Sequence, residues 1–424
     1  MSGSPTLENP GASVLATAEA AARHSYGKLV AWLAARSGNV AAAEDALSEA
    51  FSAALQTWPI QGCPQNPDAW LLTVARRKLI DQARRQQPEV GPDELETIAA
   101  SLDEASAEAI PDRRLGLLFA CAHPAIDATI RAPLMLQVVL GLEAAQIASA
   151  FLMSPAAMSQ RLVRAKTKIR QAGIPFHIPE REQMPERLEA VLDAIYTAFS
   201  EGWQDPAGAD PARRELAEEA IYLCRIVTGL LPSEPEAFGL LALMLYAEAR
   251  RAARRNLAGA FVPLRQQDTA LWNAVMIAQA ETALLHASRA GRIGRYQLEA
   301  AIQSAHVERH RTGVTNWPAI LTLYNALFAV TGSPVAALNR ALALAEVAEP
   351  EAGPHAALRT LDQLAEDPRL LGYQPYWAAR ADLLARTGQS ALADQAYERA
   401  IGLERDPAVR NFLERRRKKE ASNG

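Results

Sequence analysis

Alanine and leucine dominate this sequence, whereas runs of β-branched residues bounded by turn residues are almost absent. Alanine and leucine favour helix, and the missing β-branched runs are the main signal of strands. Hydrophobic residues make up 49% of the 424 residues and charged residues 22%, so the chain can bury a sizeable core and is not disordered throughout. The sequence therefore predicts an all-α protein, and its length suggests two to three domains.

Charge and turn residues divide the chain into four stretches. Residues 13–85 show the pattern of several helices and end in a basic cluster, and residues 113–176 are helical again with a basic end. Residues 86–112 carry acidic charges only, since no lysine or arginine occurs between Arg85 and Arg113. We predict two small helical domains joined by an acidic linker. A C-terminal domain, residues 186–415, follows as amphipathic helices broken by Gly, Pro and Asp turns.

The end of the C-terminal domain carries a repeat signature. Aromatic, apolar and small residues recur at the spacing of one tetratricopeptide repeat of about 34 residues. They are Trp377, Ala381, Leu384, Gly388, Ala393, Tyr397 and Ala400. The pattern predicts a tetratricopeptide-like helical solenoid over roughly residues 190–415, with Trp377, Leu384 and Tyr397 between the paired helices. An irregular helical bundle is the alternative.

A basic helix behind a tight turn ends the second small domain. Residues 143–151 predict a short helix, after which Ser154 is placed to cap a second helix that has Pro155 in its first position. One face of the second helix is apolar, the other is basic, and no acid occurs between Ser154 and Arg170. This pattern predicts a helix-turn-helix whose second helix fits the DNA major groove. An ordinary amphipathic helix with a solvated basic face is the alternative.

Other classes of protein find little support in the sequence. The net charge of −4 does not itself indicate nucleic-acid binding, because attraction to phosphates is local. Three widely spaced cysteines indicate neither disulfides nor a metal site, and we expect no cofactor. His306 and His310 are four residues apart but lack a third ligand. With no nucleotide or nucleophile motif, signal peptide or long apolar run, we expect a cytoplasmic protein that is not an enzyme and does not contact the membrane.

Several segments together resemble one family. The run LVRAKTKIRQAGIPF at residues 162–176 is similar to the end of the promoter −35-reading domain of extracytoplasmic-function (ECF) RNA polymerase sigma factors, and RLGLLFACAHP at 114–124 to that domain's first helix in one subgroup. AEDALSEAF at 43–51 and WLLTVARR at 70–77 resemble the sigma-2 domain. Residues 266–272, 296–298, 315–317 and 333–341 extend the likeness to the subgroup with a C-terminal tetratricopeptide-like domain.

The resemblance implies that residues 13–85 bind core RNA polymerase through its β′ clamp helices, with further contacts to the β subunit. The acidic residues lie at helical spacing on one side of residues 43–51, which suits a basic partner surface. The implied core-binding residues are Glu44, Asp45, Leu47, Ser48 and Glu49. A solvated charged face is the ordinary alternative for such a pattern.

Residues 13–85 would also bind the promoter −10 element. A turn-rich loop from Trp58 to Asp68 can meet an unstacked base, and the arginines beyond it suit promoter phosphates. The implied −10 residues are Trp58, Gln61, Asn66, Arg76, Arg77, Lys78, Arg84 and Arg85. Trp70 is expected in the core. The acidic linker would thread through the polymerase cleft and RNA exit channel, with a plain tether as the alternative.

The resemblance assigns residues 113–176 to the −35 element of promoter DNA. The implied −35 residues are Ser154, Ala157, Ser159, Gln160, Arg161, Arg164 and Lys168. The C-terminal domain would modulate transcription and could have a protein or ligand partner of its own. A stand-alone DNA-binding repressor or activator and a tetratricopeptide scaffold are the rival interpretations. The repressor leaves the acidic helix and linker unused, and the scaffold predicts peptide binding without transcription.

Overall fold

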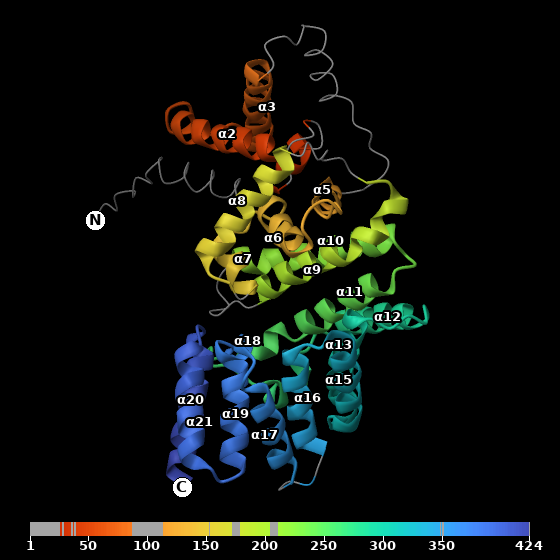
Figure 1. Ribbon diagram of the computed structural model, residues 1–424, viewed down its shortest axis with the longest axis vertical. Helices are drawn as coiled ribbons and strands as arrows, with labels where there is room; N and C mark the ends of the chain where they lie inside the picture. Colours follow the sequence, from red (N-terminus) through yellow and green to blue (C-terminus); the bar gives the residue numbers. More distant parts are fainter. Residues whose placement is uncertain are drawn as a thin grey trace, which may run out of the picture. The chain divides into compact units, whose positions relative to one another are not determined.

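The protein is described from a computed structural model, shown in Figure 1. The structure describes residues 26–27, 29–34, 37, 40–86, 113–151, 153–171, 179–203, 211–347, 349 and 352–423. The prediction of an all-α protein is confirmed: within these ranges, β pairing is limited to one isolated bridge between Arg255 and Phe261. None of the helices described here combines the length and apolar character that crossing a bilayer requires. The predicted acidic linker lies outside the described residues, apart from Gln86.

The chain folds into two compact units, Met1–Ala198 and Phe199–Gly424. The first unit begins with helical residues before position 40. Its further helices are α2 (Val40–Gln61), α3 (Pro67–Gln86), α5 (Arg113–Cys121), α6 (Ala128–Val138), α7 (Ala144–Ala150), α8 (Pro155–Gln171), the 3₁₀ turn η1 (Arg181–Gln183) and α9 (Met184–Trp203), which runs across the unit boundary.

Helices α2 and α3 pack through large buried side chains. Leu47, Trp58 and Leu71 are almost fully buried, and the rings of Trp58 and Trp70 meet edge to face with centroids 5.5 Å apart. Trp70 is half-buried beside this core.

The predicted start of the loop at Trp58 is wrong. Helix α2 continues to Gln61 with Pro59 inside it, because the indole of Trp58 is held in the core. Gly62 then ends the helix in the left-handed region at φ 86°, which glycine adopts without steric cost, and its N–H donates to the carbonyl of Trp58. The loop is therefore short, from Gly62 to Asn66, and α3 begins at Pro67.

The predicted turn before the basic helix is confirmed. Helix α8 begins at Pro155, and the Ser154 hydroxyl accepts a hydrogen bond from the N–H of Ala157 at 3.3 Å. This bond satisfies one of the N–H groups that a helix leaves free at its start. Met158, Leu162 and Ile169 are buried on the inner face of α8, as the sequence pattern indicates.

The second unit consists of short helices that pack mostly against their neighbours in the chain. They are α10 (Pro211–Leu230), α11 (Pro235–Ala249), η2 (Arg251–Arg254), η3 (Leu264–Gln266), η4 (Thr269–Leu271), α12 (Ala274–Ser288), α13 (Arg295–Val307), α14 (Arg309–Thr312), α15 (Trp317–Thr331), α16 (Pro334–Val347), α17 (Ala352–Leu364), α18 (Pro368–Leu371), α19 (Gln374–Arg386), α20 (Ser390–Leu403) and α21 (Pro407–Asn423). Figure 1 shows the longer helices from α15 to α21 standing side by side.

The residues of the repeat signature occupy the helical hairpin α19–α20. Ala381, Leu384 and Tyr397 are buried in it, and Gly388 makes the turn at φ 75°. One detail differs from the prediction: Trp377 is only half-buried, and the neighbouring Tyr376, 1% exposed, fills the core. Trp377 lies at the edge, where its indole N–H donates to the carbonyl of Leu371.

The basic run at the end of α21 fastens that helix to the hairpin. Arg416 pairs with Asp382 on α19, and Arg417 makes two bonds of 2.5 and 2.8 Å to the carboxylate of Asp394 on α20. These arginines are only a third exposed. Arg416 and Arg417 therefore pack α21 against the α19–α20 hairpin.

Candidate protein and nucleic-acid interfaces

The acidic residues of α2 differ in exposure: Asp45 and Glu49 are exposed, whereas Glu44 is half-buried. Asp45, Ser48 and Glu49 are exposed and available to a partner. Glu49 forms an ion pair of 2.9 Å with Lys78 of α3, but both side chains are about half exposed, so the pair contributes little to stability. Leu47 was expected to contact polymerase, and this is wrong for the structure described here: it is fully buried between α2 and α3, because it faces the core with Ala43 and Ala50.

Glu44 lies inside the unit and not on the open face of α2. Its carboxylate oxygens are 2.7 and 2.9 Å from Nζ of Lys166 on α8, and the two side chains are only 12% and 22% exposed. Burial raises the pKa of Glu44 above its ordinary value, although Lys166 acts in the opposite direction. The ion pair joins the predicted polymerase-binding helix to the predicted −35-reading helix.

Two further contacts surround this ion pair. Burial raises the pKa of Tyr26, and the negative charges of Glu44 and Asp45 raise it further. Next to it, a Cβ atom on Gly27 would lie 1.8 Å from the carbonyl oxygen of Val139, so only glycine permits this close approach to the end of α6. The helical residues Tyr26 and Gly27 therefore lie directly against the end of α6, in the same compact unit as α8.

The residues predicted to bind the −10 element differ in how exposed their side chains are. Gln61, Arg77 and Lys78 are exposed, and Arg76 is half-buried. Asn66 is exposed, but its side-chain oxygen accepts a hydrogen bond from the N–H of Ala69 and so caps α3. The side chains of Arg84 and Arg85 lie outside the described residues.

Trp58 must be corrected as a −10 residue. Its side chain is 1% exposed and packs against Trp70, so it cannot stack on a base in this conformation. The burial follows from its position on the inner face of α2, one turn beyond Ala54. Near the end of α2, the exposed side chains that remain include Ile60, Cys63 and Gln65.

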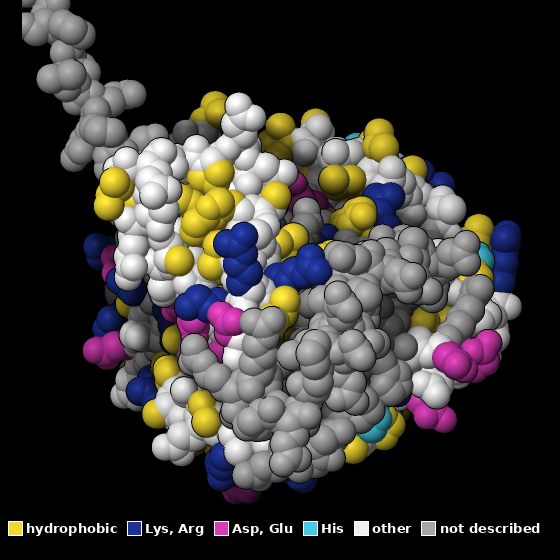
Figure 2. All heavy atoms as spheres, turned by 90° about the horizontal axis from the view of Figure 1, so that it is seen from above, with side chains coloured by type: hydrophobic (Ala, Val, Ile, Leu, Met, Phe, Trp, Pro, Cys, Tyr) yellow, Lys and Arg dark blue, Asp and Glu magenta, His cyan; other side chains and the backbone are white. Residues whose placement is uncertain are grey.

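The predicted −35 residues form an exposed face on α8. Ser159, Gln160, Arg164 and Lys168 are exposed, and Ala157 is half-buried at the start of the helix. In the view of Figure 2, lysine and arginine side chains lie next to acidic and hydrophobic side chains on the same surface. Helix α8 itself carries no acidic residue, so the charge of its outer face is positive and suits a negatively charged partner.

Arg161 is held differently from Arg164. Its guanidinium donates to the hydroxyl of Thr129 and to the sulfur of Met153, which ties α8 to α6. The same Thr129 donates to Asp127, and its side-chain and backbone hydrogen bonds hold the pKa of that carboxyl below its ordinary value. Arg161 therefore helps position α8 within its domain.

Lys166 was missed by the sequence analysis. It lies four residues after Leu162 and three before Ile169, which places it at the edge of the apolar face. A lysine at such a position on a helix that is otherwise basic on its outer face was the available signal. Its acidic partner could not be found, because Glu44 is 122 residues away along the chain.

His306 and His310, four residues apart in the second unit, each contact a tryptophan ring. His306 meets the ring of Trp317 edge to face, and His310 is tilted over Trp272. Burial lowers the pKa of His306 to about 4, and Arg250, Arg265 and Arg309 lower it further. Such a positive environment opposes a metal cation. Among the residues that the structure describes, no group of three metal-ligating side chains is found.

Comparison with known proteins supplies the family. The chain is 42% identical over 376 residues to an uncharacterized protein of Rhizobium meliloti (strain 1021), with 86% of each chain covered. The chain belongs to the family of that rhizobial protein. Residues 22–89 match Sigma-70 region 2, and residues 187–288 match a family of unknown function, DUF6596. No solved structure matches the chain.

The region 2 match covers the whole α2–α3 pair, including the exposed acidic residues of α2 and the basic residues of α3. Sigma-70 proteins are transcription initiation factors, and the match supports such a role for this chain, with core RNA polymerase and promoter DNA as partners. The DUF6596 match covers α10, α11 and α12 of the second unit and assigns no activity to it.

Proposed function

We propose that the protein is a sigma factor of the ECF type, which binds core RNA polymerase and directs promoter-specific initiation in the cytoplasm. The observation that carries this proposal is the occurrence of Sigma-70 region 2 in one chain with α8, a capped helix with an acid-free exposed face. Region 2 would contact the polymerase through Asp45, Ser48 and Glu49 of α2. Helix α8 would enter the major groove at the −35 element as the second helix of a helix-turn-helix.

Run-off transcription with bacterial core polymerase tests this proposal. The full chain should confer initiation at a defined start site, and Arg164→Ala should weaken the −35-dependent signal by about 1–3 kcal/mol of binding free energy. Arg289→Ala, an exposed arginine of the second unit, is the matched control. A chain that binds duplex DNA tightly alone and never co-purifies with core polymerase would instead be a repressor or activator.

The ion pair between Glu44 and Lys166 bears on how such a sigma factor engages a promoter. The −10 and −35 elements are separated by about 25 base pairs, roughly 85 Å of duplex at 3.4 Å per base pair. Two elements joined by contacts of 2.7–2.9 Å cannot serve both sites at once. The contact between region 2 and α8 would therefore open when polymerase binds, and Glu44 would join the polymerase-binding surface only then.

Lys166→Ala tests this opening. Removal of the partner should leave Glu44 buried without compensation, weaken the packed arrangement and increase the affinity for core polymerase in the absence of DNA. Lys168→Ala is the matched control, because Lys168 is exposed on the same helix. Equal affinity of both variants and the parent chain would show that the contact does not limit polymerase binding.

The second unit would modulate transcription as a tetratricopeptide-like domain. Consecutive packing of α15 to α21 and the buried small residues of the α19–α20 hairpin support this proposal. Truncation after Phe176 should change the amount of transcript made from the same promoter. Unchanged transcription in vitro and in vivo would remove the regulatory role.

A further inference from the structure

The segment RRAARR at residues 250–255 joins the end of α11 to the turn η2 and lines a hollow in the second unit. The hollow has a volume of about 570 Å³. We call this hollow the arginine pocket. The charged and apolar side chains that line it include Arg214, Glu248, Arg251, Arg254, Arg255 and Met276. All of these residues belong to Phe199–Gly424, so the pocket lies within one compact unit.

The positive charge of the arginine pocket is only partly balanced. Glu248 bonds to Nε of Arg251 at 2.6 Å, and Asp406 bonds to Arg255 at 2.7 Å. The Arg254 guanidinium instead donates to the carbonyl of Trp203 at 2.8 Å and stacks over its ring at 3.7 Å. Among the described residues that line the pocket, four are arginines and one, Glu248, is a carboxylate.

One guanidinium nitrogen beside the pocket has no hydrogen-bond acceptor among the described residues. Nη2 of Arg251 is shielded from solvent and has no hydrogen-bond partner in the described part of the chain. A buried unpaired donor on a charged group is costly, and native structures usually satisfy such a group with protein, water or a ligand. Oε2 of Glu248, on the carboxylate that pairs with Arg251, is likewise shielded and without a partner among the described residues, so this ion pair leaves one donor and one acceptor beside the pocket for a ligand or water.

The arginines also repel one another. Burial lowers the pKa of Arg254 to about 10, and the neighbouring charges of Arg251 and Arg255 lower it further. Arg250, directly behind them, has a pKa of about 10 for the same reasons: burial first, then Arg254 and Arg309. An anion between the guanidinium groups would reverse the sign of these interactions.

The volume of the arginine pocket indicates how large its ligand can be. A volume near 570 Å³ falls within the range typical of small-molecule sites, roughly 300–1,000 Å³. Leu271 and Met276 provide apolar surface beside the arginines. Asn273 uses its side-chain oxygen to cap α12, which leaves its amide N–H groups as donors at the rim.

We propose that the arginine pocket binds the phosphate group of a small organic phosphate. Arginine is suited to this role because its planar guanidinium donates two parallel hydrogen bonds to phosphate oxygens. Arg251, Arg254 and Arg255 come from a single turn, so their positions relative to one another are fixed by α11 and η2. This role is independent of promoter recognition and gives the second unit a ligand of its own.

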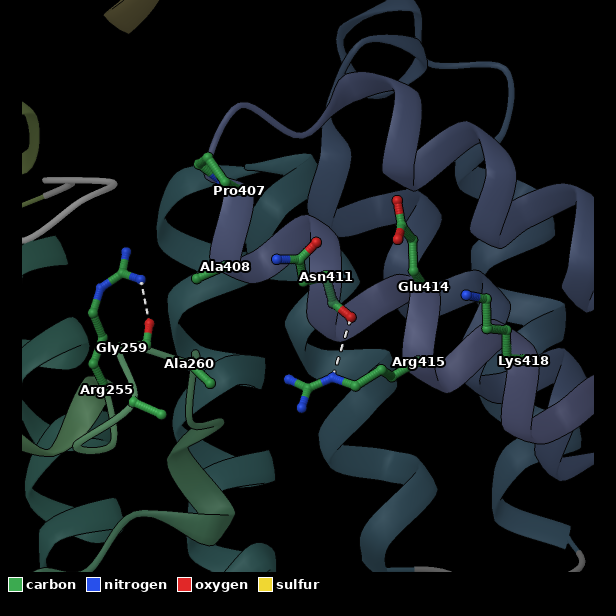
Figure 3. Close-up of a pocket in the computed structure, with 10 residues that line it drawn as sticks. Arg255, Gly259, Ala260, Pro407, Ala408, Asn411, Glu414, Arg415 and Lys418 are labelled. Carbon is green, nitrogen blue, oxygen red and sulfur yellow. Dashed lines mark hydrogen bonds between the residues drawn. The ribbon is translucent and has the colours of Figure 1, made fainter.

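A second hollow shares Arg255 but is less suited to an anion. Figure 3 shows Arg255 donating to the carbonyl of Gly259 and Arg415 donating to that of Asn411, with Glu414 and Lys418 along α21. Each hollow has one carboxylate, Glu414 here and Glu248 in the arginine pocket, but the arginine pocket is lined by four guanidinium groups and this hollow by two. The arginine pocket is therefore the better candidate for the phosphate.

Calorimetric titration of the full chain with inorganic pyrophosphate tests the proposal, with sodium chloride at matched ionic strength as the reference. Arg214→Ala removes an exposed guanidinium at the rim, and Arg254→Lys keeps the charge but removes the fork. Both should weaken saturable binding at least about tenfold. Arg359→Ala on α17, an exposed arginine remote from the pocket, should leave the affinity unchanged.

Three outcomes overturn the proposal. One is the absence of saturable pyrophosphate binding above the salt reference, and another is equal affinity in Arg214→Ala, Arg254→Lys and the parent chain when circular dichroism shows all three folded. The third concerns the source of the phosphate. If a single-stranded oligonucleotide binds in a way that Arg214→Ala weakens, while pyrophosphate does not bind, the site recognises a nucleic-acid backbone and not a small phosphate.

Discussion

The outer face of α8 in the first unit and two arginines of the second unit, Arg250 and Arg309, use positive charge in opposite ways. On α8, Arg164 and Lys168 are exposed, and Arg164 bonds to the carbonyl of Gln160 on its own helix. In the second unit, Arg250 is 7% exposed and bonds to the carbonyl of Tyr246 and to Gln303, and Arg309 donates to three backbone carbonyls of residues 264–267. Exposed cations remain available to an external phosphate, whereas buried ones hold the chain together. A count of charges in the sequence does not separate these uses.

The largest expected effect tests this difference through stability. Arg250→Ala should lower the free energy of unfolding of the second unit by about 3 kcal/mol, because it leaves a cavity and unpaired backbone and amide groups. Arg164→Ala, on the exposed face of α8, should change stability by less than about 0.5 kcal/mol. Urea unfolding followed by tryptophan fluorescence measures both.

Arg250→Met separates packing from charge. It should cost less than Arg250→Ala, because it fills much of the space and removes a positive charge that Arg254 and Arg309 repel. If Arg250→Ala were as mild as Arg164→Ala, the contrast between the two units would be lost.

A smaller effect concerns two arginines on the same helix. Arg161→Ala should weaken binding of the −35 element less than Arg164→Ala does, because Arg161 is engaged with Thr129 and Met153. Arg164→Ala should cost about 1–3 kcal/mol if it contacts a base edge. Fluorescence anisotropy with the polymerase holoenzyme and −35 duplexes measures the difference. A larger loss in Arg161→Ala would place Arg161 in the groove after rearrangement.

The smallest effect compares two carboxylates by pH. In the second unit, Glu346 is half-buried, which raises its pKa, but hydrogen bonds from Arg265 and Arg386 overcome this effect and hold the pKa below the ordinary value of 4.5. The stability that Glu346 contributes is therefore present above pH 4.5 and is lost as the pH falls through its folded-state pKa. Glu346→Gln should destabilise the chain at pH 7 by about 1 kcal/mol, and the two curves should converge in acid.

The contribution of Glu44 to stability should depend on pH with the opposite sign. Its pKa is raised, mainly by burial, so its ionised form is disfavoured in the folded chain and stability increases as the pH falls through the raised pKa towards 4.5. Glu44→Gln should therefore leave stability at pH 7 unchanged or slightly increased. Urea unfolding between pH 7 and 4 measures both variants. A loss at pH 7 as large as that of Glu346→Gln would show that the single lysine outweighs the burial.

Local patterns in the sequence were enough for the start of α8 and for the buried faces of several helices. The cap at Ser154, the start of α8 at Pro155 and the buried faces of α8 and of the α19–α20 hairpin follow from residue spacing, because a helix repeats every 3.6 residues. The exposed positions on α8 followed in the same way. Errors arose where packing overrode a local signal, as at Trp58, whose burial extends α2 past Pro59, and at Trp377, which Tyr376 displaces from the core.

The sequence by itself determined an all-helical chain and the basic outer face of α8, since these depend on neighbours within a few residues. Only the tertiary structure decided that Glu44 meets Lys166, that Gly27 touches the end of α6 and that Arg214 and Met276 line one pocket with the arginines after α11. Such contacts join residues far apart in the chain. Their distances depend on how whole helices pack, and no local spacing records that.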